Sequence, residues 1–258
     1  MVRVPEPDRA DPPLVISQDG SGAIWTLTLN RPGKANALDA EKVERLLTAV
    51  AEARAAGARA LILGGAGRNF CAGFDFAGYE KQSAGDLLHR FVRIEQLLQR
   101  LRRGPMVSVA LARGAAYGAG ADLFAACTWR VAAPTARFRF PGFRFGVALG
   151  TRHLARVVGA QHARSILLTG RVVDAQEAAA IGLATRVVEP TADLAAAILQ
   201  ESAVLDGQAV DEILQLTGDD TEDADLASLV RSLTRPGLHR RIAQFRAGTA
   251  VLPGTAKT

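Results

Sequence analysis

A chain of 258 residues with 48% hydrophobic side chains can bury one sizeable core, with room for a smaller appendage. No apolar run approaches the roughly 20 residues that a membrane-spanning helix needs, which argues against a membrane partner. The polar, proline-rich stretch over residues 1–13 lacks the apolar segment of a secretory signal, so it predicts a flexible tail and a cytoplasmic protein.

The net charge of +5 does not by itself indicate a nucleic-acid partner. The arginines are scattered, and no basic stripe with interleaved aromatic residues appears, so solvated helix faces explain them better. Cys71 and Cys127 lie in apolar stretches without C-x-x-C spacing, which favours buried thiols in a reducing compartment. The four histidines show no ligand spacing, so we expect no metal site.

The first predicted elements are two strands, over 14–18 and 23–30, joined by the turn DGSG into a hairpin. A helix follows, with Asp39 as its N-cap and Gly57 as its stop signal. The apolar run at 60–64 then predicts a short buried strand.

Ser83 and Asp86 resemble a capping box that starts a long helix, which Gly104 and the following proline end. The apolar run at 106–111 is the next predicted strand. Strands that alternate with helices in this way predict an α/β fold with parallel strand pairing.

After Pro190 the pattern changes to helices broken by polar loops. We therefore divide the chain into the tail at 1–13, an α/β core at 14–191 and a helical region at 192–258. The apolar faces of that helical region predict packing on the core or on another subunit.

One phrase occurs twice, as CAGFDF at 71–76 and as GAGADLF at 118–124. Each copy follows an apolar strand, and each reads as strand, glycine-rich loop, Ala-Gly-x-Asp and helix. Two such loops from neighbouring strands can aim two backbone N–H groups at one oxygen, which is the chemistry of an oxyanion hole. Literal alignment of the copies nominates the amides of Phe74 and Ala121. The plainer alternative is two ordinary strand-to-helix turns.

Four stretches carry a resemblance to a known family: LNRPGKANALD (29–39), GGAGRNFCAGFDF (64–76), RGAAYGAGADLFAACTWRVAAPTARF (113–138) and TGRVVDAQEAAAIGLATRVV (169–188). They resemble the crotonase superfamily, the enoyl-CoA hydratase/isomerase family. The resemblance implies a crotonase-like spiral of β-β-α units, C-terminal helices that form trimers or pairs of trimers, and coenzyme A thioesters as ligands. It implies no cofactor, because coenzyme A is part of the substrate.

By position in the family's motifs, the resemblance implies that the oxyanion-hole amides are those of Phe74 and Ala119. Ala119 lies two residues before Ala121, which the literal alignment nominated. It also implies a coenzyme A-binding backbone made of Lys34, Ala35, Ala72, Gly73, Asp75 and Phe76. For Lys34, an exposed loop lysine is as good an interpretation as a phosphate contact.

The acid–base residues depart from the family pattern. A hydratase of this family uses two glutamates, and the matching positions here are Asp122 and Gly142. Aspartate withdraws its carboxylate by about 1.5 Å relative to glutamate, and glycine donates nothing. Three arginines surround the vacant position: Arg137, Arg139 and Arg144. One of them could pair with Asp122 or meet an acidic acyl chain, although solvated side chains are the simpler interpretation.

Two functions from different classes remain open. The first is an acyl-CoA enzyme, a lyase or isomerase of fatty acid metabolism, in which Asp122 moves a proton on an enolate held in the oxyanion hole. The second is an acyl-CoA-binding homologue without hydratase activity, because Gly142 replaces the second glutamate.

Overall fold

The computed structural model describes residues 12–189, 194, 197, 199–200, 205–218 and 220–248, so all but two residues of the predicted tail lie outside the described part. The strands of the main sheet are β1 (Leu14–Gln18), β2 (Ile24–Leu29), β3 (Ala60–Gly65), β4 (Val107–Ala112), β6 (Trp129–Ala132) and β9 (Arg186–Val187). Their order is β1-β2-β3-β4-β6-β9. The β1–β2 hairpin is antiparallel and the other neighbours are parallel, as the sequence predicts.

A smaller sheet lies beside the carboxyl ends of the main strands. It consists of β5 (Ala115–Tyr117), β7 (Arg137–Arg139) and β8 (Val173–Asp174) in that order, with β5 and β7 parallel. The chain enters β5 directly after β4, and it turns at Gly118 into a helix. The second Ala-Gly-x-Asp phrase therefore begins where the two sheets meet.

The two predicted helices form with the predicted caps. Helix α1 (Ala40–Ala55) begins after Asp39, whose side chain accepts a hydrogen bond from the Lys42 N–H. Helix α2 (Ala84–Arg102) begins with the complete capping box of Ser83 and Asp86. The remaining helices are α3 (Ala119–Ala126), α4 (Thr151–Val158), α5 (Ala160–Thr169), α6 (Ala175–Ala180), α8 (Gly207–Leu216), α9 (Glu222–Leu233) and α10 (Leu238–Arg246), with 3-10 turns η1 (Pro32–Lys34), η2 (Tyr79–Lys81) and η3 (Gly142–Phe145).

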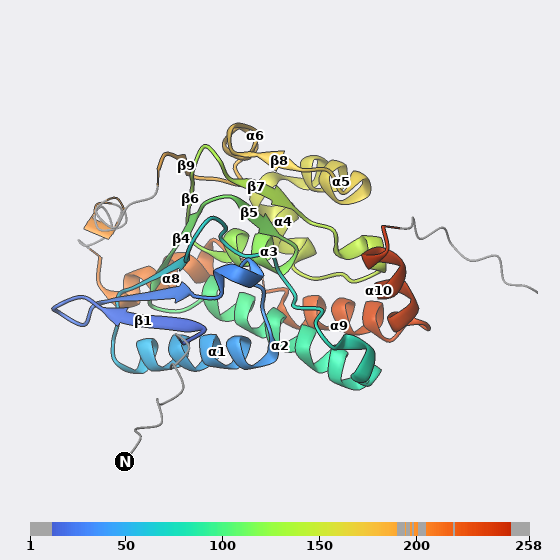
Figure 1. The fold of residues 1–258 in the computed structure, drawn as a ribbon. Coiled ribbons are helices and arrows are strands. Elements are labelled where there is room, and N and C mark those ends of the chain that lie inside the picture. The colour runs from blue at the N-terminus through green and yellow to red at the C-terminus, as the bar shows by residue number, and fades with distance from the viewer. Residues whose placement is uncertain are drawn as a thin grey trace, which may run out of the picture.

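The parallel strands are buried on both faces. In β3, Leu61 and Leu63 join the main hydrophobic core, whereas Ile62 joins a second cluster together with Val210 of α8. Figure 1 shows α1 and α2 on one side of the main sheet, with α9 and α10 continuing that layer. Burial on both faces explains why β3 and β4 read as continuous apolar runs rather than alternating ones.

The helices near the carboxyl terminus pack on the α/β part of the chain. Leu229 and Leu233 of α9 and Leu238 and Ile242 of α10 are buried in the main core. Of the two expectations for this region, packing on the core therefore accounts for the inner faces of α9 and α10. The boundary at 191–192 itself stays a prediction.

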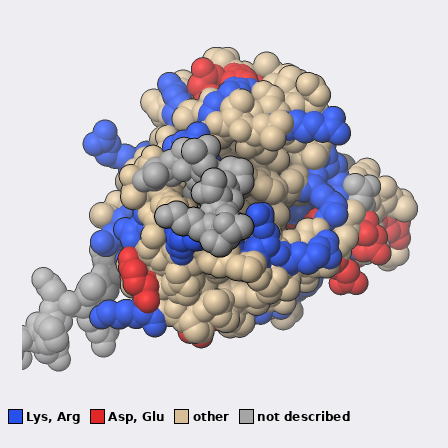
Figure 2. Space-filling model, turned by 90° about the vertical axis from the view of Figure 1, so that its right-hand side faces the viewer, with Lys and Arg blue, Asp and Glu red and all other residues tan. Residues whose placement is uncertain are grey.

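Basic side chains are spread over the face that Figure 2 shows, and acidic ones gather in fewer places. This distribution agrees with the net charge of +5. In the part of the chain that the structure describes, no helix combines the length and the apolar character needed to cross a membrane.

Candidate active site

The two copies of the repeated phrase lie against each other. The Cys71 N–H donates to the Ala115 carbonyl at 3.1 Å, and the Tyr117 N–H donates to the Cys71 carbonyl at 2.9 Å. A Cβ at Gly73 would lie 2.4 Å from the Tyr117 carbonyl oxygen, so only glycine permits this approach. The two phrases therefore face each other across these backbone hydrogen bonds, and the oxyanion hole that they would build stays a prediction.

The two phrases differ in the structure that follows them. The prediction that a helix follows each phrase is wrong for the phrase at 71–76. Ala119 begins α3, but Phe74 lies in a loop that pairs with Leu38, and only the short turn η2 follows it. The reason is that the Leu38 N–H donates to Gly73 and the Leu38 carbonyl accepts from Asp75, which fixes this loop in an extended form. The positive end of a helix is therefore present at Ala119 alone.

Both amides that the resemblance nominates are available to a ligand. Within the described residues, neither the Phe74 N–H nor the Ala119 N–H donates a hydrogen bond to another backbone group. The Ala121 N–H, which literal alignment nominated, donates to the Gly118 carbonyl at 2.8 Å. The geometry therefore favours Ala119 over Ala121.

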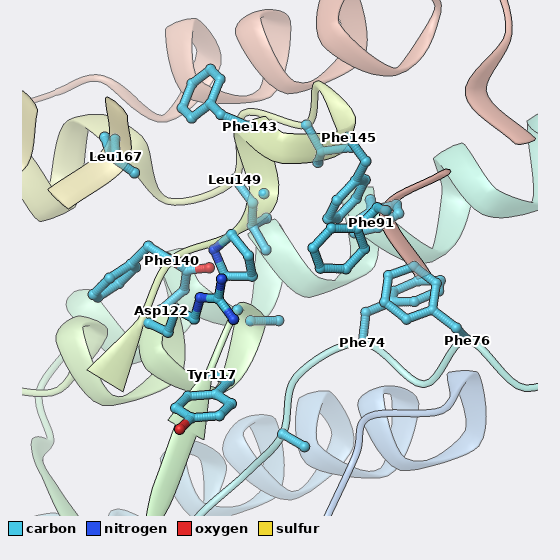
Figure 3. A pocket seen from close by; sticks show the side chains of 18 residues that line it. Phe74, Phe76, Phe91, Tyr117, Asp122, Phe140, Phe143, Phe145, Leu149 and Leu167 are labelled. Carbon is cyan, nitrogen blue, oxygen red and sulfur yellow. The ribbon is translucent and has the colours of Figure 1, made fainter. Parts of the chain in front are cut away.

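Phe74 and Ala119 line a cavity of about 180 Å³. Its walls come from the 71–76 loop, α2, the β5–α3 turn, the 139–149 segment, α5 and α10. Figure 3 shows Asp122 and Phe140 on one side of the cavity and Phe74, Phe91 and Phe145 on the other. The charged residues of its lining are Asp122 and Arg139.

The comparisons with known proteins agree with this architecture. Residues 19–234 match the family model for enoyl-CoA hydratase/isomerase, which is most of the chain. The chain belongs to the enoyl-CoA hydratase/isomerase family.

A solved structure from Bordetella parapertussis, assigned as an enoyl-CoA hydratase/isomerase, is 46% identical with a TM-score of 0.86, over 91% of this chain and 98% of that one. The probable enoyl-CoA hydratase echA6 of Mycobacterium tuberculosis is 38% identical over 150 residues, or 57% of this chain and 60% of that protein. The ethylmalonyl-CoA decarboxylase of Gallus gallus is 32% identical over 59% of this chain and 52% of its own length. This chain thus matches about half to three-fifths of these curated relatives.

The aspartates of the two Ala-Gly-x-Asp phrases, Asp75 and Asp122, lie in different environments. Asp75 forms an ion pair with Arg31 at 3.3 Å, and it does not line the cavity. Asp122, on α3, lines the cavity and is only 7% exposed. Burial raises the pKa of the Asp122 carboxyl well above its usual value, the nearby Glu95 raises it further, and Arg102 opposes the shift. Asp122 therefore holds its proton to higher pH than an exposed aspartate does.

Sequence reasoning missed Glu95, which lies behind Asp122. This α2 residue is 1% exposed, and its Oε2 accepts a hydrogen bond from the Gly150 N–H at 3.2 Å. A Cβ at Gly150 would in turn lie 2.7 Å from Asp122 Oδ1, so Gly150 touches both carboxyl groups. A glutamate in a long helix has no signal of its own, and only the tertiary contact with Gly150 reveals it.

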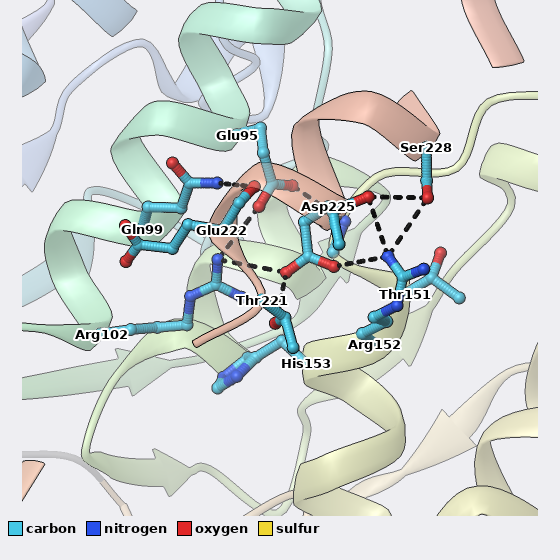
Figure 4. A network of polar contacts seen from close by, with 12 residues as sticks. Glu95, Gln99, Arg102, Thr151, Arg152, His153, Thr221, Glu222, Asp225 and Ser228 are labelled. Carbon is cyan, nitrogen blue, oxygen red and sulfur yellow. Dashed lines mark hydrogen bonds and ion pairs between the residues drawn. The ribbon is translucent and has the colours of Figure 1, made fainter. Parts of the chain in front are cut away.

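Glu95 belongs to a buried polar network that joins α2, α4 and α9 (Figure 4). Arg102 Nη2 donates to Glu95 Oε1 at 3.0 Å and lies 3.9 Å from Asp225 Oδ2. Arg152 Nη1 donates to the other oxygen of Asp225 at 3.1 Å. Burial raises the pKa of Glu95, and Arg102 opposes that shift. The network therefore holds the Glu95 side chain in place. Glu95 in turn holds Gly150, which contacts the Asp122 carboxyl.

The position of the missing second glutamate is closed by backbone. The Val147 N–H donates to the Gly142 carbonyl at 2.9 Å. A Cβ at Gly142 would lie 2.7 Å from the Val147 carbonyl oxygen, a distance that real Cβ atoms do not tolerate. The loop is therefore built around glycine, and it has no space for a longer side chain without moving.

The guanidinium groups of the three arginines near this position donate hydrogen bonds to backbone carbonyl oxygens. Arg137 donates to Ala136, Arg139 donates to Gly170, and Arg144 donates to Thr169. Among the described residues none of the three forms an ion pair with Asp122, so that suggested pairing does not occur. Arg139 lines the cavity, whereas Arg137 and Arg144 are exposed.

The residues that the resemblance assigns to coenzyme A binding lie in two loops that contact each other. The Ala72 N–H donates to the Ala35 carbonyl at 2.9 Å, which joins the two loops. Lys34 is exposed beside Ala35, and Ala72 and Phe76 line the cavity. Asp75 departs from the group, since its carboxylate is held by Arg31.

Two other reactive side chains are excluded as nucleophiles or bases. Cys71 is fully buried, and burial raises the pKa of its thiol to about 12. His153 contacts the Ala125 carbonyl of α3, and burial lowers its pKa to about 3, so it stays neutral. His89 is exposed and does not line the cavity.

Proposed function

We propose that the protein binds acyl-CoA or enoyl-CoA thioesters, with the thioester oxygen between the N–H groups of Phe74 and Ala119. One observation carries the proposal: two backbone amides that have no backbone acceptor among the described residues line one apolar cavity beside a buried carboxyl. Fixed donors in a site that excludes water stabilise the charge that develops on a carbonyl oxygen. Coenzyme A would enter past Ala35 and Ala72, and the chemistry needs no further cofactor.

Asp122 is the proton carrier of this site. Its raised pKa makes the ionised carboxyl a stronger base than an exposed aspartate, which suits a group that removes a proton and returns it. One carboxyl next to an oxyanion hole supports isomerisation or another enolate chemistry, in which the same group removes and returns a proton. It does not support concerted hydration, which needs a second acid where Gly142 stands.

The closed backbone at Gly142 favours a second candidate function. A protein that keeps the amides and the cavity but has lost one acid can serve as an acyl-CoA-binding protein without turnover. The two functions share the binding site and differ only in what Asp122 does.

A panel of acyl-CoA and enoyl-CoA thioesters, tested for both binding and turnover, decides between them. We expect saturable calorimetric heat with dissociation constants in the micromolar to millimolar range that is typical of substrates. Asp122→Asn should reduce turnover by about 10²–10⁴-fold and leave binding nearly unchanged, because the two amides are backbone groups. Binding without any turnover supports the second candidate, and no binding at all refutes both.

A further inference from the structure

The cavity has an unusual concentration of phenylalanine. The chain holds 10 phenylalanines, and seven of them line this one cavity. They come from segments far apart in the sequence: the 71–76 loop, α2, the 139–149 segment and α10. Tyr117 adds a further ring, and among the described residues the charged lining consists of Asp122 and Arg139.

One wall of rings is fixed next to the Phe74 amide. The Phe74 ring stacks on Phe91 at 4.3 Å between centroids, with 8° between the ring planes. The Arg90 guanidinium lies 4.0 Å from the Phe74 ring centroid, and it is itself held by a 2.8 Å hydrogen bond to the Asp75 carbonyl. The residue that offers the amide therefore also offers a rigid aromatic surface.

A second group of rings, Phe76, Phe145 and Phe245, closes the same side of the cavity. Phe76 meets Phe145 edge to face at 5.7 Å, and Phe145 lies 4.8 Å from Phe245. Edges and faces of different rings are thus presented together. A further planar ring can make edge-to-face contacts there, whereas a saturated chain gains only the burial of its surface.

The size of the cavity agrees with one ring. A cavity of about 150 Å³ lined by Leu, Ile and Phe takes up benzene, and the cavity here is about 180 Å³. A six-membered ring on a short linker to the thioester carbonyl fits this space. A long saturated acyl chain exceeds it.

We infer that the acyl group is an aryl-acyl group, a single aromatic ring joined by a short linker to the thioester carbonyl. This inference rests on the proposed function, since it assumes that the thioester oxygen lies at Phe74 and Ala119. Phe145 and Phe245 are then specificity-determining residues, because their rings meet the ring of the ligand.

Calorimetry with matched thioesters tests the inference. Phenylacetyl-CoA and cyclohexylacetyl-CoA differ only in the aromaticity of the ring, and octanoyl-CoA, palmitoyl-CoA and free coenzyme A complete the panel. We expect phenylacetyl-CoA to bind about tenfold more tightly than cyclohexylacetyl-CoA or octanoyl-CoA, on the scale of one or two aromatic contacts.

Ring-removing variants locate the effect. Phe245→Leu, at a half-buried position on α10, and Phe145→Leu should reduce the aryl preference to about threefold or less. Phe70→Leu is the matched control, because that ring packs on Phe124 outside the cavity and its loss should leave the preference unchanged. Thermal melting confirms that each variant is folded.

The outcomes separate this inference from the proposed function. Heat with none of the thioesters overturns both. Equal affinity for aryl and saturated thioesters, or tighter binding of palmitoyl-CoA, overturns the aryl inference alone. An aryl preference that survives both Phe145→Leu and Phe245→Leu overturns the role of these two rings.

Discussion

The carboxylate of Asp122 lies against the α-carbon of Gly150, so closely that a Cβ there would be 2.7 Å from Asp122 Oδ1. Gly150 also has a φ of +59°, which L side chains rarely adopt. We expect Gly150→Ala to displace Asp122, reduce turnover by at least about tenfold and lower the free energy of unfolding by about 1–3 kcal/mol. Steady-state kinetics and urea denaturation measure the two effects.

Gly57→Ala is the control for backbone strain alone. Gly57 has a φ of +73°, a Cβ added there would meet nothing within 4 Å, and the residue follows the end of α1. This variant should lose a similar free energy of unfolding and keep its turnover unchanged. Equal turnover in the two variants would show that the contact between Gly150 and Asp122 does not matter for activity.

Glu95→Gln should lower the pKa of Asp122. Glu95 raises that pKa through its negative charge, and glutamine removes the charge while it can still accept from the Gly150 N–H. A titration followed by the carboxyl carbon resonance of Asp122 should therefore shift to lower pH, and the pH profile of turnover should shift with it. Glu44→Gln, which breaks an exposed pair with Arg93, should move neither. If the titration of Asp122 did not shift in Glu95→Gln, the proposed influence of Glu95 on Asp122 would be refuted.

Asp122→Asn should change how stability depends on pH. The pKa of Asp122 is raised in the folded protein, so between the unfolded and the folded pKa the native state holds more protons. Wild-type stability therefore falls as pH rises through that window, which begins near about pH 4, and the asparagine variant escapes this loss. Relative to the wild type, the variant should become progressively more stable as the pH rises above about 4, as measured by denaturant titrations at a series of pH values. Asp223→Asn, at an exposed position, should show no such gain; a constant difference for Asp122→Asn would refute the raised pKa.

Gly142→Glu should fail to restore hydration of crotonyl-CoA. A side chain at this position meets the Val147 carbonyl oxygen at 2.7 Å, so the loop must move and the new carboxyl cannot take the family position. We expect a loss of about 1–3 kcal/mol in the free energy of unfolding, and a similar loss for Gly142→Ala. Rapid hydration by Gly142→Glu would contradict this prediction. It would show that the loop can adapt and that the wild-type protein lacks only the second acid.

We expect the protein to self-associate, as the family resemblance implies. The inner faces of α9 and α10 are occupied within the chain, but Leu216 of α8 is 86% exposed and Ile213 is 47% exposed. Light scattering at micromolar concentration should give about three times 27.2 kDa or a higher multiple. Leu216→Glu should lower that mass if α8 contributes to the interface. A mass of 27.2 kDa alone for the wild type would refute the expectation.

Much of the local structure follows from the sequence. The hairpin, the cap at Asp39, the capping box at Ser83 and the buried strand at Ala60–Gly65 all depend on interactions among neighbouring residues, so their signals lie within one window of the chain. The repeated phrase likewise predicts that two glycine-rich loops meet, since β3 and β4 are parallel neighbours whose carboxyl ends share one edge.

Only the tertiary structure decided how those two loops differ and what surrounds them. Pairing with Leu38 keeps Phe74 in a loop, and a salt bridge to Arg31 takes Asp75 away from the cavity. Glu95 and Asp122, 27 positions apart, become neighbours because α2, α3 and the turn at Gly150 pack together. A carboxyl group has the same local signal wherever it lies; its pKa and its use depend on burial and on charges brought close by the fold.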